Sequence, residues 1–233
     1  MSFSTVLSAA IEGLSAEFVH VEADVSNGLP VFHMVGYLSS EVKEAGERVR
    51  TAIRNAGFDY PPKRTVINLS PAALRKRGAS FDLPIAVSIL ISLGMVNPGR
   101  AGSCLLVGEL GLDGTVRKVP GVLPIVMEAG RKGIRCCIVP GENAVEGALI
   151  NDVEIIGVTD LKEAVDFLNG KRKIPAAAPE YSFREQRPDV DFGDIQGQDC
   201  CGRRSQSPAY RSAGKREIYD SQSDHRNSSA PGA

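Results

Sequence analysis

The stretch that decides the fold is KRGASFDLPIAVSILISLGMV, residues 76–96. A basic turn opens it, and apolar residues then follow at spacings that cover nearly every side of a helix. A helix that is apolar all round is normally buried against several partners. At roughly fourteen apolar-rich residues it is also too short to cross a bilayer, which needs about twenty. The stretch therefore predicts the central core helix of an α/β domain, ended by Gly94.

Elements of both kinds are expected on either side of this helix. Near-alternating apolar residues predict extended structure over residues 4–35, broken by the turn Ser26-Asn27-Gly28. Asp113-Gly114 predicts a hairpin. Because strands come first as a meander and later alternate with helices, the sequence predicts an α/β (α+β-like) domain with a mixed sheet. The other strands are expected at 64–69, 104–109, 136–139 and 153–158, and the other helices at 39–57, 121–132, 142–150 and 160–169.

Composition sets limits on function. The formal net charge is −1, which gives no global reason to expect a nucleic-acid or membrane partner, so any such patch must be local. The first residues lack the basic start of a signal peptide. Four of the five cysteines form two adjacent pairs, Cys136-Cys137 and Cys200-Cys201, and this spacing does not suit a tetrahedral zinc site. A reduced cytoplasmic protein without a membrane partner is the simplest interpretation.

The composition changes after residue 170. Residues 171–188 are rich in alanine, proline and charge, and predict a linker. Residues 189–198, DVDFGDIQGQ, have the character of the start of another folded unit. From Asp199 to Ala233 the only large aliphatic residue is Ile218. Such a segment cannot bury enough apolar surface to offset a backbone ordering cost of about 1–2 kcal/mol per residue, and is expected to be disordered.

Three blocks in residues 1–170 resemble the N-terminal domain of the magnesium chelatase-like AAA+ proteins of the ComM competence type. They are SNGLPVFHMVGYLSSEVKEAGERVRTAIRNAGF at 26–58, INLSPAALRKRGASFDLPIAVSIL at 67–90 and VGELGLDGTVRKVPGVLPIV at 107–126. The resemblance implies a fold like the Lon protease proteolytic domain and ribosomal protein S5, termed S5 domain 2-like. It also implies that residues 189–198 match the start of an AAA+ domain, which in complete relatives drives DNA branch migration.

The chain departs from that family pattern at the nucleotide site. A phosphate-binding loop needs G-x-x-x-x-G-K-[ST]. The nearest fragment, Gly214-Lys215, is followed by Arg216, and Ala209 stands where the first glycine belongs. We therefore expect no ATP hydrolysis and no cofactor in this chain, with ATP and magnesium expected only for a full-length relative. The polar tail resembles the product of a shifted frame or early stop, and a truncated product without independent activity is one alternative; resequencing the downstream frame tests it.

Ser80 is the candidate nucleophile, because the resemblance aligns it with the serine of Lon-type Ser-Lys peptidases. A serine hydroxyl needs a base to take its proton. The same alignment places Leu123 at the lysine position, and Lys118 lies before the expected helix. The alternative is that Ser80 caps the core helix, with Asp82 at its positive end. The sequence therefore predicts a degenerate, non-catalytic site, with a Ser-Lys peptidase as the competing hypothesis.

A local basic patch is the candidate nucleic-acid interface. Nine lysines and arginines lie between residues 43 and 77, against the acids Glu44, Glu47 and Asp59. Phosphate backbones attract such clusters, although pairing with Glu44 and Glu47 along a helix is the competing interpretation. We expect DNA as a partner, with AAA+ subunits or self-association as alternatives. The candidates are Lys43, Arg48, Arg50, Arg54, Lys63, Arg64, Arg75, Lys76 and Arg77.

Overall fold

The computed structural model describes residues 3–179. The expected end of the linker, the expected start of an AAA+ domain at 189–198 and the expected tail at 199–233 lie outside the described residues. The strands are β1 (Phe3–Glu12), β2 (Ser15–Ser26), β3 (Phe32–Val35), β4 (Arg64–Ser70), β5 (Cys104–Leu106), β6 (Glu109–Leu110), β7 (Val116–Arg117), β8 (Cys136–Pro140) and β9 (Glu154–Val158). The helices are α1 (Ser40–Asn55), α2 (Asp82–Ser92), α3 (Pro98–Ala101), α4 (Val122–Arg131), α5 (Ala144–Gly147), α6 (Leu161–Leu168) and the 3₁₀ turn η1 (Gly141–Asn143).

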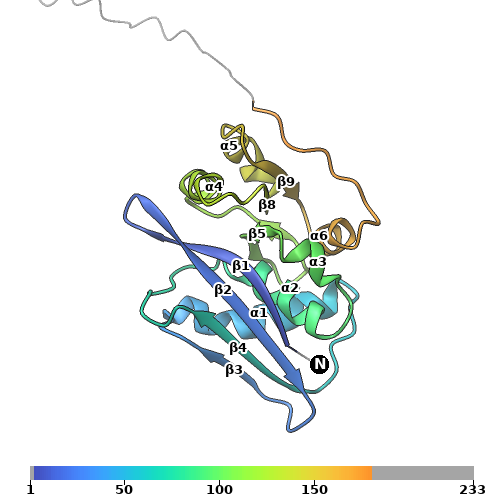
Figure 1. The fold of residues 1–233 in the computed structure, drawn as a ribbon. Coiled ribbons are helices and arrows are strands. Elements are labelled where there is room, and N and C mark those ends of the chain that lie inside the picture. The colour runs from blue at the N-terminus through green and yellow to red at the C-terminus, as the bar shows by residue number, and fades with distance from the viewer. Residues whose placement is uncertain (1–2, 180–233) are drawn as a thin grey trace, which may run out of the picture. The chain divides into compact units, whose positions relative to one another are not determined.

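Within residues 3–179, seven strands form one mixed sheet in the order β3-β4-β2-β1-β5-β8-β9 (Figure 1). The strands β6 and β7 form a small hairpin. β1 and β2 pair antiparallel from Phe3 opposite Asp24 to Glu12 opposite Ser15. β5, β8 and β9 continue the sheet in parallel. The predicted mixed α/β class is confirmed, as is the hairpin at Asp113-Gly114.

The first part of the sheet is not a simple meander, and that expectation is wrong at β3. β4 lies between β2 and β3, antiparallel to β2 and parallel to β3. Parallel neighbours need a crossover connection, and α1 supplies it between β3 and β4. The crossover is tightly packed, since a Cβ on Gly46 of α1 would lie 2.9 Å from the Phe32 ring of β3. The turn at Ser26–Gly28 thus reverses the chain without pairing the strands on either side of it.

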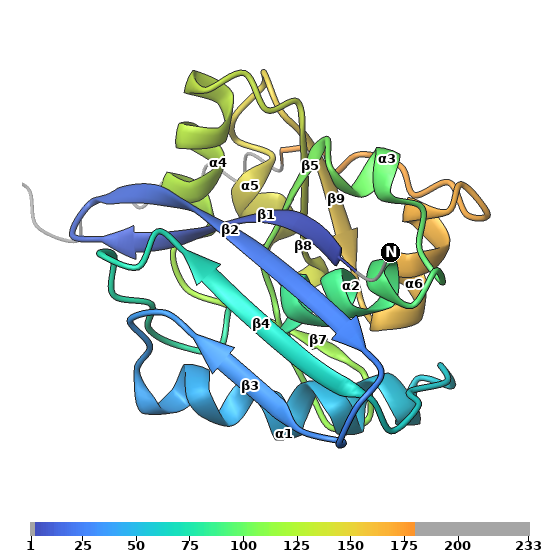
Figure 2. The ribbon, with the colours of Figure 1, turned by 60° about the horizontal axis from the view of Figure 1, so that its bottom comes forward.

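The predicted core helix is α2, and its residues Asp82–Leu90 are all buried. It shares one buried cluster with α1, α6 and the strands beside them, while α4 packs in a second cluster with residues of β5, β8 and β9. Figure 2 shows α1 running along β3 and β4, away from α4 and α5. Ser80 lies just before α2, so the buried position of this helix determines where the candidate site lies.

Residues 171–179, the described part of the expected linker, run along the domain. Ile174 packs against the first buried cluster and Ala177 against the second. The Ala177 backbone N–H also donates to the Ile155 carbonyl of β9 at 2.9 Å. Among residues 3–179, no helix is long and apolar enough to cross a membrane.

Candidate functional site

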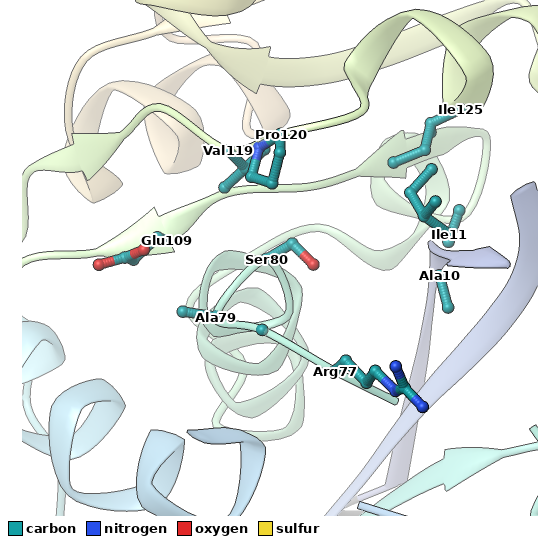
Figure 3. A pocket seen from close by; sticks show the side chains of 11 residues that line it. Ala10, Ile11, Arg77, Ala79, Ser80, Glu109, Val119, Pro120 and Ile125 are labelled. Atoms are coloured by element: carbon teal, nitrogen blue, oxygen red, sulfur yellow. The ribbon is translucent and has the colours of Figure 1, made fainter. Parts of the chain in front are cut away.

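Ser80 lies in a cavity of about 250 Å³ between the end of β1, the turn before α2 and the segment before α4. The Ser80 side chain is half-buried, and its hydroxyl is turned towards the β1 side of the cavity, whereas Glu109 is turned the other way (Figure 3). The site therefore holds a hydroxyl, one guanidinium and one carboxylate in a largely apolar setting. The lining residues used below are Ile11, Arg77, Ser80, Glu109, Val119 and Pro120.

Ser80 does not cap α2, so that expectation is wrong. The helix begins at Asp82 and has no side-chain cap. Instead, the backbone of the preceding turn is tied to the strand segment beside it: Gly108 N–H donates to the Ser80 carbonyl at 2.9 Å, and Leu83 N–H donates to the Gly108 carbonyl at 3.0 Å. This pairing fixes the Ser80 backbone, and the Ser80 hydroxyl makes no hydrogen bond in the described part of the chain.

The described residues offer Ser80 no lysine. Lys118 is exposed and does not line the cavity, and Leu123 lies in the first turn of α4, where its N–H donates to Glu146 Oε1 at 3.1 Å. The cation that lines the cavity is Arg77, and a guanidinium does not give up its proton in proteins, so it cannot act as a general base. The arrangement can hold a polar ligand, but it lacks the base that a serine nucleophile needs.

Asp82 forms a buried ion pair with Arg48 that was not predicted from the sequence. Its side chain is fully buried, and the two carboxylate oxygens accept from Arg48 Nε at 2.9 Å and Arg48 Nη2 at 3.1 Å. A third hydrogen bond comes from Leu110 N–H at 3.3 Å. Burial raises the pKa of the Asp82 carboxyl, and the Arg48 hydrogen bond acts in the opposite direction. The ion pair and the Leu110 hydrogen bond join α1, α2 and β6. The sequence signal for this pair was Asp82, a charged residue inside an apolar run.

Asn143 holds the other wall of the cavity. Its fully buried side chain accepts from Val119 N–H at 2.9 Å and donates to the Val119 carbonyl at 3.0 Å. The same amide nitrogen donates to Glu146 Oε2 at 3.0 Å, so η1 and α5 are linked to the segment before α4. Asn143 carried no signal in the sequence, because only the tertiary structure brings it opposite residue 119.

Two of the nine basic candidates have structural roles in this fold. Lys76 is fully buried, its Nζ donates to the Pro71 carbonyl, and burial lowers its pKa. Its side chain cannot reach a partner, so Lys76 is removed from the candidate interface. Arg48 is held by Asp82, as described above. The basic run therefore includes residues that stabilise the loop and the helix interface.

Six of the remaining candidates make no ion pair with a carboxylate within residues 3–179. Arg50 is the exception, because it pairs with Glu47 at 3.1 Å. The competing interpretation, in which helical neighbours neutralise the patch, therefore holds only for Arg50. We call the others the open basic set: Lys43, Arg54, Lys63, Arg64, Arg75 and Arg77.

The open basic set falls into two groups at opposite ends of α1. At the C-terminal end, Arg54 lies over the ring of Tyr60 at 5.7 Å, and Tyr60 bonds Thr65 next to Arg64. At the N-terminal end, Arg75 lies over the ring of Tyr37 at 5.6 Å, and Lys76 C=O accepts from Ser39 N–H just before the helix. A sixteen-residue helix is about 24 Å long, so the two groups form separate patches.

Metal binding has no support in this part of the chain. Among residues 3–179, no group of three or more histidine, cysteine, aspartate or glutamate side chains could hold an ion.

A known protein family matches the part of the chain that contains these residues. The family described as subunit ChlI of Mg-chelatase matches residues 21–143, more than half of the chain. The chain belongs to the Mg-chelatase ChlI family. That match runs from within β2 through β8 and so takes in Ser80, the Arg48–Asp82 pair and the basic run. The expected resemblance to magnesium chelatase-like proteins is thereby confirmed.

Individual proteins are also similar to this ChlI-family chain over most of its length. It is 42% identical over 177 residues to the competence protein ComM of Haemophilus influenzae, covering 76% of this chain and 35% of that protein. It is 38% identical over 199 residues to the uncharacterized protein YifB of Escherichia coli, covering 85% of this chain and 39% of YifB. The matched part thus corresponds to little more than a third of these relatives. A more distant likeness, 28% over 179 residues, joins 72% of the chain to 22% of Lon protease 1 of Sorangium cellulosum.

Proposed function

We propose that this ChlI-family domain is a non-catalytic module of a ComM-type protein that contacts nucleic acid. The observation that carries the proposal is the open basic set, six cations that have no carboxylate partner within residues 3–179, in a chain of net charge −1. Charges that are paired within the protein gain little from a phosphate, whereas unpaired surface cations release condensed counterions when they bind one. The proposal requires neither nucleotide nor metal in this domain.

The aromatic partners strengthen the proposal at the N-terminal end of α1. Tyr37 is 53% exposed and lies beside Arg75. An exposed ring next to a guanidinium is suited to stack a base while the cation contacts the backbone. The Tyr60 ring is buried, so at the C-terminal end Arg54 and Arg64 offer charge alone. We therefore assign backbone contacts to the C-terminal group and base stacking to the N-terminal group.

The DNA prediction is tested by fluorescence anisotropy with a labelled duplex and a labelled single strand between 50 and 200 mM salt. We expect affinity to fall steeply with salt, and the triple variant Arg54→Gln/Lys63→Gln/Arg64→Gln to reduce the salt slope by about one per lost phosphate contact. Tyr37→Ala is expected to weaken single-strand binding by about 1–3 kcal/mol and duplex binding less.

The matched control is Lys118→Gln/Arg135→Gln/Lys162→Gln, which removes three exposed positive charges from the segment before α4, the residue before β8 and α6. If it weakens binding as much as the first triple variant, the effect reports net charge and not a site. Wild-type affinity that is absent or independent of salt contradicts the nucleic-acid proposal. Docking to AAA+ subunits or self-association, read by sedimentation, would then take its place.

The second candidate function is a degenerate Ser-Lys peptidase, favoured by the position of Ser80 in an open cavity. We expect a serine-directed fluorophosphonate probe to leave the chain unlabelled, since no lysine among residues 3–179 lines the cavity and an unactivated serine is a weak nucleophile. Intact-mass measurement checks this. Stoichiometric labelling that disappears in Ser80→Ala would show that Ser80 is an activated nucleophile and overturn the non-catalytic assignment.

A further inference from the structure

Cys104 and Cys136 lie side by side on neighbouring parallel strands. Cys104 opens β5, Cys136 opens β8, and the two residues are paired in register. Their sulfur atoms are 2.9 Å apart, and both thiols are free. In-register residues of a parallel pair direct their side chains to the same face of the sheet, which explains why the two thiols meet although they are 32 residues apart in sequence.

The backbone geometry allows these two thiols to be joined. Neighbouring strands lie about 4.8 Å apart, within the Cα separation of about 4.4–6.8 Å that disulfides span. Cys137 is placed differently, because successive residues of a strand point to opposite faces. It packs in the second buried cluster, opposite Leu105 in register, and burial raises its pKa to about 12. The sheet thus separates one contacting pair from a third, inert thiol.

Access and proton sharing favour reaction at this pair. Cys136 is half-buried, so an oxidant reaches the contacting pair from the Cys136 side. The hydrogen bond between the sulfurs lowers the pKa of the Cys104 thiol, while the same contact raises that of Cys136. Cys104 therefore loses its proton more readily, and Cys136 is in place to resolve an oxidised Cys104.

We propose that Cys104 and Cys136 are a modification site that a peroxide converts into an intrachain disulfide. The Cys104 sulfur, as thiolate, attacks one peroxide oxygen, the O–O bond breaks, and the hydroxide that leaves takes up the proton lost by Cys104 to form water, giving a sulfenic acid at Cys104. The Cys136 sulfur attacks the Cys104 sulfur, the S–O bond breaks, and the displaced hydroxide takes the Cys136 proton as a second water. Two thiols lose two electrons in total and one peroxide is reduced to two waters.

The disulfide would enclose residues 104–136, which include one whole side of the Ser80 cavity. Glu109, Val119, Pro120 and Ile125 all line the cavity from within this loop. A cross-link at its base restricts that loop in the unfolded chain and stabilises the folded one. Oxidation is therefore expected to raise the melting temperature of the domain, by about 5 °C or more.

Peptide mapping tests the proposal on the full chain. After hydrogen peroxide treatment, alkylation and trypsin digestion, we expect peptide 101–117 linked to peptide 136–162, at 2 Da below the summed masses by loss of two hydrogens. The linked species should persist in Cys137→Ala and vanish in both Cys104→Ala and Cys136→Ala. The rise in melting temperature should follow the same pattern across the variants. Because residue 136 is only half-buried, Cys136→Ala is expected to fold even if Cys104→Ala does not, and it then tests the link by itself.

Each other outcome overturns the inference. Loss of the link in Cys137→Ala would mean that the wrong neighbour was assigned. A link to Cys200 or Cys201 would place the resolving thiol in the C-terminal segment. Sulfinic or sulfonic acid at Cys104 with no linked peptide would show that Cys136 does not reach the sulfenic acid before further oxidation.

Discussion

Replacing Arg48 by methionine is expected to lower the free energy of unfolding by about 3–5 kcal/mol, the usual cost of leaving a buried charge without its partner. Asp82 is fully buried and takes two of its three hydrogen bonds from Arg48. The Arg48 side chain is 24% exposed and that of Asp82 is fully buried. Removing Arg48 therefore leaves the more deeply buried charge of the pair without its partner. Denaturant unfolding, followed by circular dichroism, measures the loss.

The deficit of Arg48→Met should depend on pH in a defined direction. Burial already raises the pKa of Asp82 above its unfolded value, and loss of the Arg48 hydrogen bond raises it further. A group whose pKa is higher in the folded state contributes stability that is present at low pH and lost as pH rises through the folded pKa. The difference between variant and wild type should therefore shrink as pH falls from 7 towards 4.

Two matched variants isolate this pair. Arg50→Met, two residues further along the helix, loses only an exposed contact with Glu47 and should cost no more than about 1 kcal/mol. The double variant Arg48→Met/Asp82→Asn removes the buried charge and should recover part of the loss at pH 7. A deficit that is the same at pH 4 and pH 7, or equal in Arg50→Met, would show that the ion pair does not stabilise the domain.

Replacing Asn143 by alanine is expected to cost about 2–4 kcal/mol, because both the N–H and the C=O of Val119 lose a buried partner. The bonds at 2.9 and 3.0 Å are the connection between η1 and the cavity wall. The loss should appear in thermal unfolding, and hydrogen exchange should rise at Val119 above all.

Asn151→Ala is the control for Asn143→Ala, since Asn151 is exposed in the loop before β9. We expect that change to lie within about 0.5 kcal/mol of wild type. If Asn143→Ala unfolds like Asn151→Ala, or if exchange at Val119 is unchanged, the amide does not hold the cavity wall.

Much of the fold followed from local patterns. The all-round apolar run identified α2 as buried, the helices expected at 39–57 and 121–132 are α1 and α4, and the Asp113-Gly114 turn identified the β6–β7 hairpin. These features depend on neighbours in sequence, so they can be found there. The place of β3 beside β4 could not be found in that way, because strand order depends on how α1 crosses over the sheet.

For the candidate sites too, the sequence located residues but not their contacts. The sequence located Ser80, the missing lysine at residue 123 and the dense basic run. It assigned Ser80 to a cap, whereas backbone pairing with Gly108 holds that turn. It also counted Lys76 and Arg48 as surface charges, although one is buried and the other is bound to Asp82.

By itself, then, the sequence determined which segments are buried and which residues carry chemistry, because hydrophobic period and residue type are properties of the chain. The tertiary structure alone decided which of those residues meet. Asp82 with Arg48, Asn143 with Val119 and Cys104 with Cys136 are 34, 24 and 32 residues apart. Such pairs form only when the sheet and the helices packed on it bring distant segments together, and no periodicity in the sequence records that contact.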